Sequence, residues 1–277
     1  MTPRTTNSGT TSSSGSSGLL ERNVTVIRDS SLHIPELYLE VYVVGDEGEQ
    51  RAFAEMFVKA KCRKAFSVDT ADLVVFTGGE DVDPIYYNES RHSTTYSSLK
   101  RDKHDIDVYK ECLEKGIPMF GVCRGAQFLA VMNGCKLFQH VDNHTGDHSM
   151  WDVQAGQLID NVSSVHHQMV RIPEDNPDFK LLGTSKESRI RWKNKTDKQE
   201  GNNTDVEAFF FTDVCAFGVQ GHPEYKGYFK FQQWCFQQMK DLIVQNPDIA
   251  IEKGHYRIKP EVLYQRQAEQ LKAKELN

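Results

Sequence analysis

Apolar runs alternate with amphipathic segments along the first half of the chain. Each run is short enough for one buried strand, and each segment repeats its apolar side chains at helical spacing. The runs lie at 41–45, 72–76 and 117–122, and the helical segments at 49–61, 102–115 and 127–132. Strands separated by helices favour parallel pairing and a sheet covered on both faces. We therefore predict a flavodoxin-like α/β fold, with a mostly parallel central sheet and helices on both faces.

The second half of the chain has a different pattern. Short β-like runs are predicted at 157–159, 188–192, 206–211 and 216–220. The polar stretch 193–204 is typical of an exposed hairpin excursion. A long helix is expected at 228–244, and the charged stretch 260–277 is expected to form a surface helix.

The chain divides into three parts by composition. Residues 1–18 are almost wholly Ser, Thr, Gly and Asn, and such a segment cannot bury enough apolar surface to fold. We expect a disordered tail or linker at 1–20, one catalytic domain at 21–250 and a C-terminal extension at 251–277.

Composition and charge limit the partners and the cellular compartment that we expect for this protein. A net charge of −6 gives no basic surface, so we expect no nucleic-acid partner. No apolar run is long enough for a membrane span, and the N-terminus lacks the apolar core of a signal peptide. Six cysteines in 277 residues do not indicate a disulfide framework. These features predict a soluble, cytoplasmic protein in which a free thiol can react.

The first candidate for chemistry is Cys123, within Gly121-Val122-Cys123-Arg124-Gly125. A strand that turns sharply into a helix exposes the residue at the turn, as in the nucleophile elbow of hydrolases. The helix N-terminus favours a thiolate there, and Arg124 adds positive charge nearby. A buried structural cysteine in a glycine-rich turn is the alternative.

A thiol nucleophile needs a base, and His222 follows the apolar run 216–220. The end of that strand should lie at the same sheet edge as Cys123. Glu224 is two residues further on and can orient the imidazole. On its own, a His-x-Glu sequence is more often an incidental loop feature.

Several motifs together resemble class I glutamine amidotransferases. Gly-Val-Cys-Arg-Gly at 121–125 is followed far downstream by Gly-Val-Gln-Gly-His-Pro-Glu at 218–224. The stretch 78–87, with Ser-Ser-Val-His-His-Gln at 163–168 and Val-Glu-Ala at 206–208, resembles the γ-glutamyl-γ-aminobutyrate hydrolase branch of that superfamily. One departure is Gly221, where that branch often has a bulky aromatic, and a glycine there predicts a wider pocket.

The resemblance implies a class I glutamine amidotransferase-like fold and specific roles for residues. Cys123, His222 and Glu224 would form a catalytic triad. The backbone N–H groups of Gly79 and Arg124 would form the oxyanion hole.

The resemblance also implies where substrate binds. Gln127, His167 and Gln168 would contact a small-molecule γ-glutamyl substrate, and no cofactor is implied.

Three histidines spaced four residues apart are candidates for a metal site. His140, His144 and His148 have the spacing of one helical face, but Gly146 and neighbouring Asp residues argue against a helix. We therefore expect no metal site there.

Three functions remain open. The first is a stand-alone enzyme that cleaves a γ-glutamyl amide through a thioester. The second is a glutaminase subunit that supplies ammonia to a separate synthase. The third is a non-catalytic binding protein on the same fold. An esterase is disfavoured because its acid normally precedes the histidine, whereas Glu224 follows His222.

Overall fold

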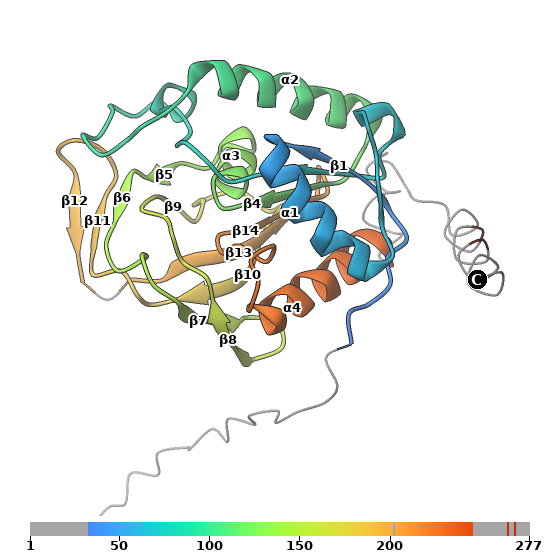
Figure 1. The fold of residues 1–277 in the computed structure, drawn as a ribbon. Helices are drawn as coiled ribbons and strands as arrows, with labels where there is room; N and C mark the ends of the chain where they lie inside the picture. The colour runs from blue at the N-terminus through green and yellow to red at the C-terminus, as the bar shows by residue number, and fades with distance from the viewer. Residues whose placement is uncertain (1–32, 202, 246–264, 266–268, 270–277) are drawn as a thin grey trace, which may run out of the picture.

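A nine-stranded sheet forms the centre of the computed structural model, which describes residues 33–201, 203–245, 265 and 269 (Figure 1). The strand order is β2-β1-β3-β4-β14-β13-β10-β7-β8. The predicted tail at 1–20 lies outside the described residues, as does the extension at 251–277 apart from residues 265 and 269.

Neighbouring strands run parallel through the first five positions of this sheet. These strands are β2 Arg63–Lys64, β1 Glu40–Val44, β3 Leu73–Phe76, β4 Met119–Val122 and β14 Ala216–Val219. From β14 onward each strand is antiparallel to its neighbour. These strands are β13 Asp205–Phe211, β10 Phe179–Ser185, β7 His148–Asp152 and β8 Gln157–Val162. The sheet is therefore mixed, with the predicted parallel pairing in the half that leads to Cys123.

Helices cover both faces of the sheet, which confirms the predicted flavodoxin-like class. They are α1 Glu47–Phe57, α2 Leu99–Lys115, α3 Arg124–Met132 and α4 Phe229–Met239. Side chains alternate along β4, so Phe120 and Val122 join the core under α1 and α4, while Met119 joins the core under α2 and α3. One set of strands thus organises two apolar layers.

Local capping explains where the helices begin and end. Asp46 caps α1 and forms a reciprocal capping box with Glu49. Ser98 caps α2, so that helix begins three residues before the predicted position 102. Gly116 ends it with a φ of 61°. The helix predicted at 228–244 is α4 followed by a π turn, η4, at Lys240–Val244.

Short elements complete the described part of the chain. The 3₁₀ turns are η1 Val58–Ala60, η2 Val68–Thr70 and η3 Pro84–Tyr87. Strands β6 His140–Val141, β11 Ile190–Trp192 and β12 Lys198–Glu200 form a separate sheet, and β5 Leu137–Phe138 pairs with β9 Met169–Val170. The pairing of β11 with β12 confirms the predicted hairpin excursion. Among the described helices, none has both the length and the apolar character that a membrane crossing requires.

Candidate active site

Cys123 lies at the junction between β4 and α3. Its φ of 52° and ψ of −112° are rare for a residue with a side chain, and such strain costs about 1–3 kcal/mol. Its neighbours leave no room for side chains: a Cβ on Gly125 would lie 2.0 Å from the carbonyl oxygen of Phe76. A Cβ on Gly121 would lie 2.6 Å from the carbonyl oxygen of Gly125. The sharp turn predicted at 121–125 is therefore present and depends on both glycines.

The parallel pairing of β4 with β14 brings His222 to Cys123. Val122 is aligned with Val219, so the residues that follow both strands emerge at the same sheet edge. The Cys123 and His222 side chains are hydrogen-bonded, and His222 Nδ1 lies 2.7 Å from Glu224 Oε1. The backbone N–H of His222 donates to Ser163 Oγ at 2.7 Å, which fixes the position of the loop.

The surroundings of His222 favour its protonated form. Burial alone would lower its pKa from 6.5, because desolvation disfavours a charge. The hydrogen bonds with Cys123 and Glu224 outweigh burial and raise the pKa of His222 to about 10. The imidazole is therefore set to hold a proton through neutral pH.

Two glycines that follow β3, Gly78 and Gly79, leave open space beside Cys123 and His222. A Cβ on Gly78 would lie 3.0 Å from His222 Cε1 and 3.8 Å from the Cβ of Cys123. Gly79 has a φ of 124°, and a Cβ there would lie 2.1 Å from Arg101 Nη1. A side chain at position 78 would crowd His222, and a side chain at position 79 would collide with Arg101.

The side chain of Arg124 points away from this chemistry. It is 2% exposed and pairs with Asp102 and Asp105 of α2. Burial raises the pKa of Asp102 even though Arg124 opposes that shift. The positive charge expected of Arg124 near Cys123 is offset, because Asp102 and Asp105 both pair with the guanidinium.

The predicted substrate residues share one pocket with Cys123. The pocket has a volume of about 210 Å³. Its lining includes the predicted residues Gly79, Cys123, Arg124, Gln127, His167 and Gln168.

Hydrogen bonds hold the polar side chains of this pocket in place. Gln127 Nε2 donates to the carbonyl oxygen of Gln168 at 3.1 Å and to Gln220 Oε1 at 3.2 Å. His167 Nε2 lies 3.3 Å from Asp81 Oδ1. Gln168 Oε1 is buried without a hydrogen-bond partner among the described residues, so it is free to accept from a ligand.

Sequence reasoning missed part of the lining. Tyr96, Val165 and His166 line the pocket with Glu80 and Asp81, and Tyr96 and Val165 are exposed at 75% and 57%. Glu80 and Asp81 lie within the 78–87 motif, but the motif alone predicts no role for them. Tyr96 carries no signal in the sequence, because it is the loop between η3 and α2 that brings it to the pocket.

The expectation that Gly221 widens the pocket is wrong. The residue is buried, and a Cβ there would meet Val162 Cγ1 at 2.7 Å and Phe231 Cε1 at 3.0 Å. Gly221 does not line the pocket. Val162 and Phe231 occupy the space that a larger side chain would need.

The three spaced histidines do not form a helical face, as anticipated. His140 lies in β6, His148 begins β7, and His144 lies in the loop between them. The ring of His140 stacks on His92 with centroids 5.7 Å apart. His144 and His148 instead approach Glu207 of β13, a residue that sequence reasoning placed only in a motif.

Comparison with known proteins assigns the family. The sequence profile of the Peptidase C26 family matches residues 57–224, a span that holds Cys123, His222 and Glu224. The chain belongs to the Peptidase C26 family. This confirms the resemblance to class I glutamine amidotransferases at the level of the superfamily.

Individual members of the group extend the comparison. A putative glutamine amidotransferase-like protein, YvdE of Lactococcus lactis, is 30% identical over 173 residues, covering 55% of this chain and 66% of its own length. A carbamoyl phosphate synthase small chain of Yersinia pseudotuberculosis is 32% identical over 120 residues, covering 43% of this chain and 27% of its own length. The matches thus span less than two thirds of either relative. A glutamine amidotransferase structure from Thermotoga maritima is 17% identical, covers 84% of this chain and 96% of its own, and has a TM-score of 0.49.

Proposed function

We propose that this protein is a cysteine-dependent amidase that hydrolyses a γ-glutamyl amide through a γ-glutamyl thioester. Membership of the Peptidase C26 family supports an enzyme that acts on amides of this kind. The observation that carries the finer proposal is the hydrogen-bonded chain from Cys123 through His222 to Glu224 at the pocket wall. Cys123 is the nucleophile, His222 the acid and base, and Glu224 the group that orients the imidazole.

In the first half of the reaction the Cys123 sulfur attacks the amide carbonyl carbon. The proton shared by Cys123 and His222 already resides on the imidazole, and the carbonyl oxygen becomes an oxyanion. The backbone N–H groups of Gly79 and Arg124 donate to this oxygen, and each such donor contributes about 2.7–4 kcal/mol. The C–N bond then breaks, and His222 gives its proton to the departing amine.

In the second half water cleaves the thioester. His222 takes a proton from the water as it attacks, and the Cys123 sulfur leaves. Glutamate is released, and the pair of Cys123 and His222 is restored with its proton on the imidazole. The negatively charged carboxylate of Glu224 stabilises the imidazolium of His222 in both halves of the reaction.

The pocket supports recognition of a γ-glutamyl group. The unpartnered Gln168 Oε1 can accept a hydrogen bond from the substrate's α-ammonium group. Glu80 and Tyr96 lie on the side of the Gly79 loop, where the amine half of the substrate would extend. A small amine suits a pocket of about 210 Å³.

The test is a comparison of steady-state rates on glutamine and on a panel of γ-glutamyl amines, with the purified protein alone. We expect amine release from at least one γ-glutamyl amine at a kcat/KM above that for glutamine. Cys123→Ala serves as the background control. Negligible turnover of every substrate would contradict the hydrolase and favour a binding protein on this fold.

A glutaminase subunit is the second candidate, and one observation favours it. The Yersinia relative is by its name the small chain of a synthase. On this reading the protein alone would be nearly idle and would prefer glutamine. Glutaminase activity that appears only with an ammonia-accepting synthase would establish this alternative and leave the triad assignment intact.

A further inference from the structure

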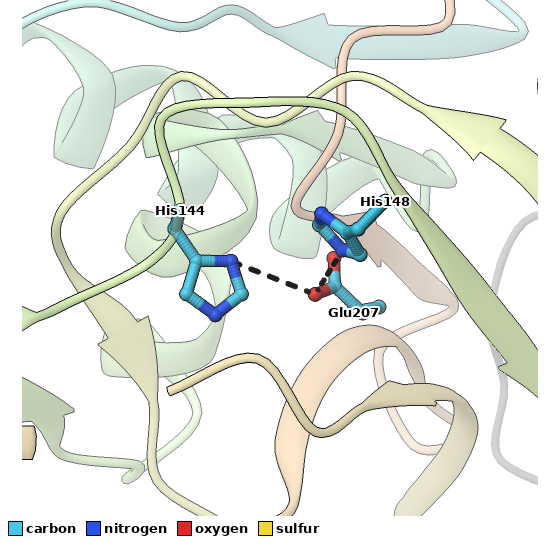
Figure 2. A group of neighbouring side chains, drawn as sticks. All are labelled: His144, His148 and Glu207. Atoms are coloured by element: carbon cyan, nitrogen blue, oxygen red, sulfur yellow. Dashed lines mark hydrogen bonds and ion pairs between the residues drawn. The ribbon is translucent and has the colours of Figure 1, made fainter. Parts of the chain in front are cut away.

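Two histidines and a carboxylate converge behind the substrate pocket. His144, His148 and Glu207 each offer a ligand atom, and these atoms lie within 4.8 Å of one another (Figure 2). Both imidazole rings point toward the Glu207 carboxylate (Figure 2). His148 Nε2 lies 2.8 Å from Glu207 Oε1, and His144 Nδ1 lies 3.9 Å from the same oxygen.

The charge of Glu207 lacks a permanent counterion. The side chain is 1% exposed, and its ion-pair partners among the described residues are the two histidines. Nearby Asp205 differs, because Arg191 Nη2 lies 2.6 Å from its Oδ1. A buried carboxylate without a cation is costly, and a bound metal ion would offset that cost.

One oxygen of Glu207 is unused. Oε1 accepts from Ser185 Oγ at 2.8 Å and contacts His148, whereas Oε2 is buried with no hydrogen-bond partner in the described chain. Such an atom needs an explanation in a well-packed interior. A cation bound at the carboxylate would supply it.

The surroundings also match those of metal-binding histidines. Such a histidine usually presents one ring nitrogen to the metal and the other to a carboxylate, which fixes the ring. His144 Nδ1 faces Glu207, and His144 Nε2 lies 3.3 Å from Asp205 Oδ2. Asp205 is in turn fixed by Ser188, whose Oγ donates to it at 2.5 Å.

The geometry points to a divalent metal site, best suited to Zn²⁺, formed by His144 Nδ1, His148 Nε2 and Glu207. Bond lengths of about 2.0–2.2 Å in a tetrahedral site separate ligand atoms by roughly 3.3 Å. The observed separations of 2.8 and 3.9 Å bracket that value, so small side-chain rotations would close the site. A fourth position is left for water. This reverses our expectation that these histidines bind no metal.

The metal would have a structural role and no part in the reaction. It would tie the loop before β7 and the first residue of β7 to β13. His144 also packs on His166, with ring centroids 4.6 Å apart, and His166 lines the substrate pocket. The ion therefore supports the pocket wall without contacting substrate.

Direct metal binding tests the proposal. Because Cys123 and His222 could themselves hold a zinc ion, the protein carries Cys123→Ser throughout. After EDTA treatment and gel filtration it is titrated with ZnCl₂ by calorimetry, and bound metal is counted by mass spectrometry. We expect one equivalent of zinc and a higher Tm for the loaded protein.

Variants locate the bound ion. Glu207→Gln and His148→Gln should each weaken zinc binding by at least about tenfold. His104→Gln is the matched control, since His104 on α2 has a side chain that is 62% exposed, and it should bind as the parent does. If a ligand variant does not fold, the titration of the parent still decides. Uptake below about a tenth of an equivalent, or uptake that both ligand variants leave unchanged, would overturn the site.

Discussion

At the residue scale, Cys123 can be distinguished from three of the other cysteines by the effect of burial on their pKa values. All six cysteines are free and buried, but burial raises the pKa of Cys112, Cys135 and Cys215 to about 12, which makes them poor nucleophiles. Cys123→Ala should lower kcat/KM on the order of 10⁵-fold while leaving the circular dichroism spectrum unchanged. Cys215→Ala is the control and should keep its activity. Labelling of Cys215 by a glutamine-like chloroketone, with activity lost in step, would overturn the assignment.

The histidine and its acid should act as one unit with Cys123. His222→Asn should cost nearly as much activity as Cys123→Ala, because both the thiol and the leaving amine lose their proton partner. Glu224→Gln should cost less, on the order of 10³-fold. The loss in the double variant His222→Asn/Glu224→Gln should fall well short of the sum of the single losses in free energy. Additive losses would argue that these residues work independently.

The pH profile reports on His222. Its pKa of about 10 predicts that activity falls at alkaline pH near that value, as the proton donor for the leaving amine is lost. Stability from the charged imidazole is fully present below its ordinary pKa of 6.5 and is lost as pH rises through about 10. Because the Glu224 hydrogen bond raises this pKa, Glu224→Gln should move the alkaline limb of kcat/KM to lower pH. An unmoved limb would assign it to another group.

At the element scale, the elbow depends on the absence of side chains. Gly125→Ala would place a Cβ 2.0 Å from the carbonyl oxygen of Phe76, so β3 and α3 would have to separate. We expect a loss of about 3 kcal/mol in the free energy of unfolding, measured in urea. Gly146→Ala is the control, since nothing lies within 4 Å of its built Cβ, and it should change stability by less than about 0.5 kcal/mol. Equal effects would contradict the packing argument.

The elements themselves were largely predictable. Strand and helix periods located β1, β3, β4, β14, α1 and α2 to within a few residues, because each buries apolar side chains. The two-residue strand β2 was not predicted, because both of its side chains are exposed. The order of the antiparallel half was not predictable, since contacts between distant segments set it. Gly116 is predicted as the end of α2 from residue type alone, and the same signal at Ser98 would give its start.

The triad and pocket were predicted for different reasons. Cys123 and His222 stand at strand ends, so strand pairing alone brings them together. The paired state of Arg124 was not predictable, because Asp102 and Asp105 look like ordinary surface acids of an amphipathic helix. Glu207 was missed as a partner of His148 for a similar reason: the two are 59 residues apart and meet only in the fold.

At the scale of the whole molecule, both helical layers rest on the same strands. Phe120 supports the layer with α1 and α4, and its neighbour Met119 supports the layer with α2 and α3. We therefore expect one cooperative unfolding transition. Tryptophan fluorescence, which includes the buried Trp234 of α4, and far-ultraviolet circular dichroism should give the same urea midpoint. Two separated midpoints would show that the layers fold as independent units.

The buried trio of Arg124, Asp102 and Asp105 has a consequence for how such sequences diverge. Losing Arg124 leaves two carboxylates in the interior without their shared counterion, and such an unpaired buried charge typically costs about 3–5 kcal/mol. A cost of that size is comparable to much of a domain's stability, so one-step replacements would rarely survive. Asp102 and Asp105 lie 22 and 19 residues before Arg124, yet we expect the three positions to have evolved together. The residues of this trio beside Cys123 are therefore coupled by epistasis. During evolution they can be replaced only by several substitutions that occur together.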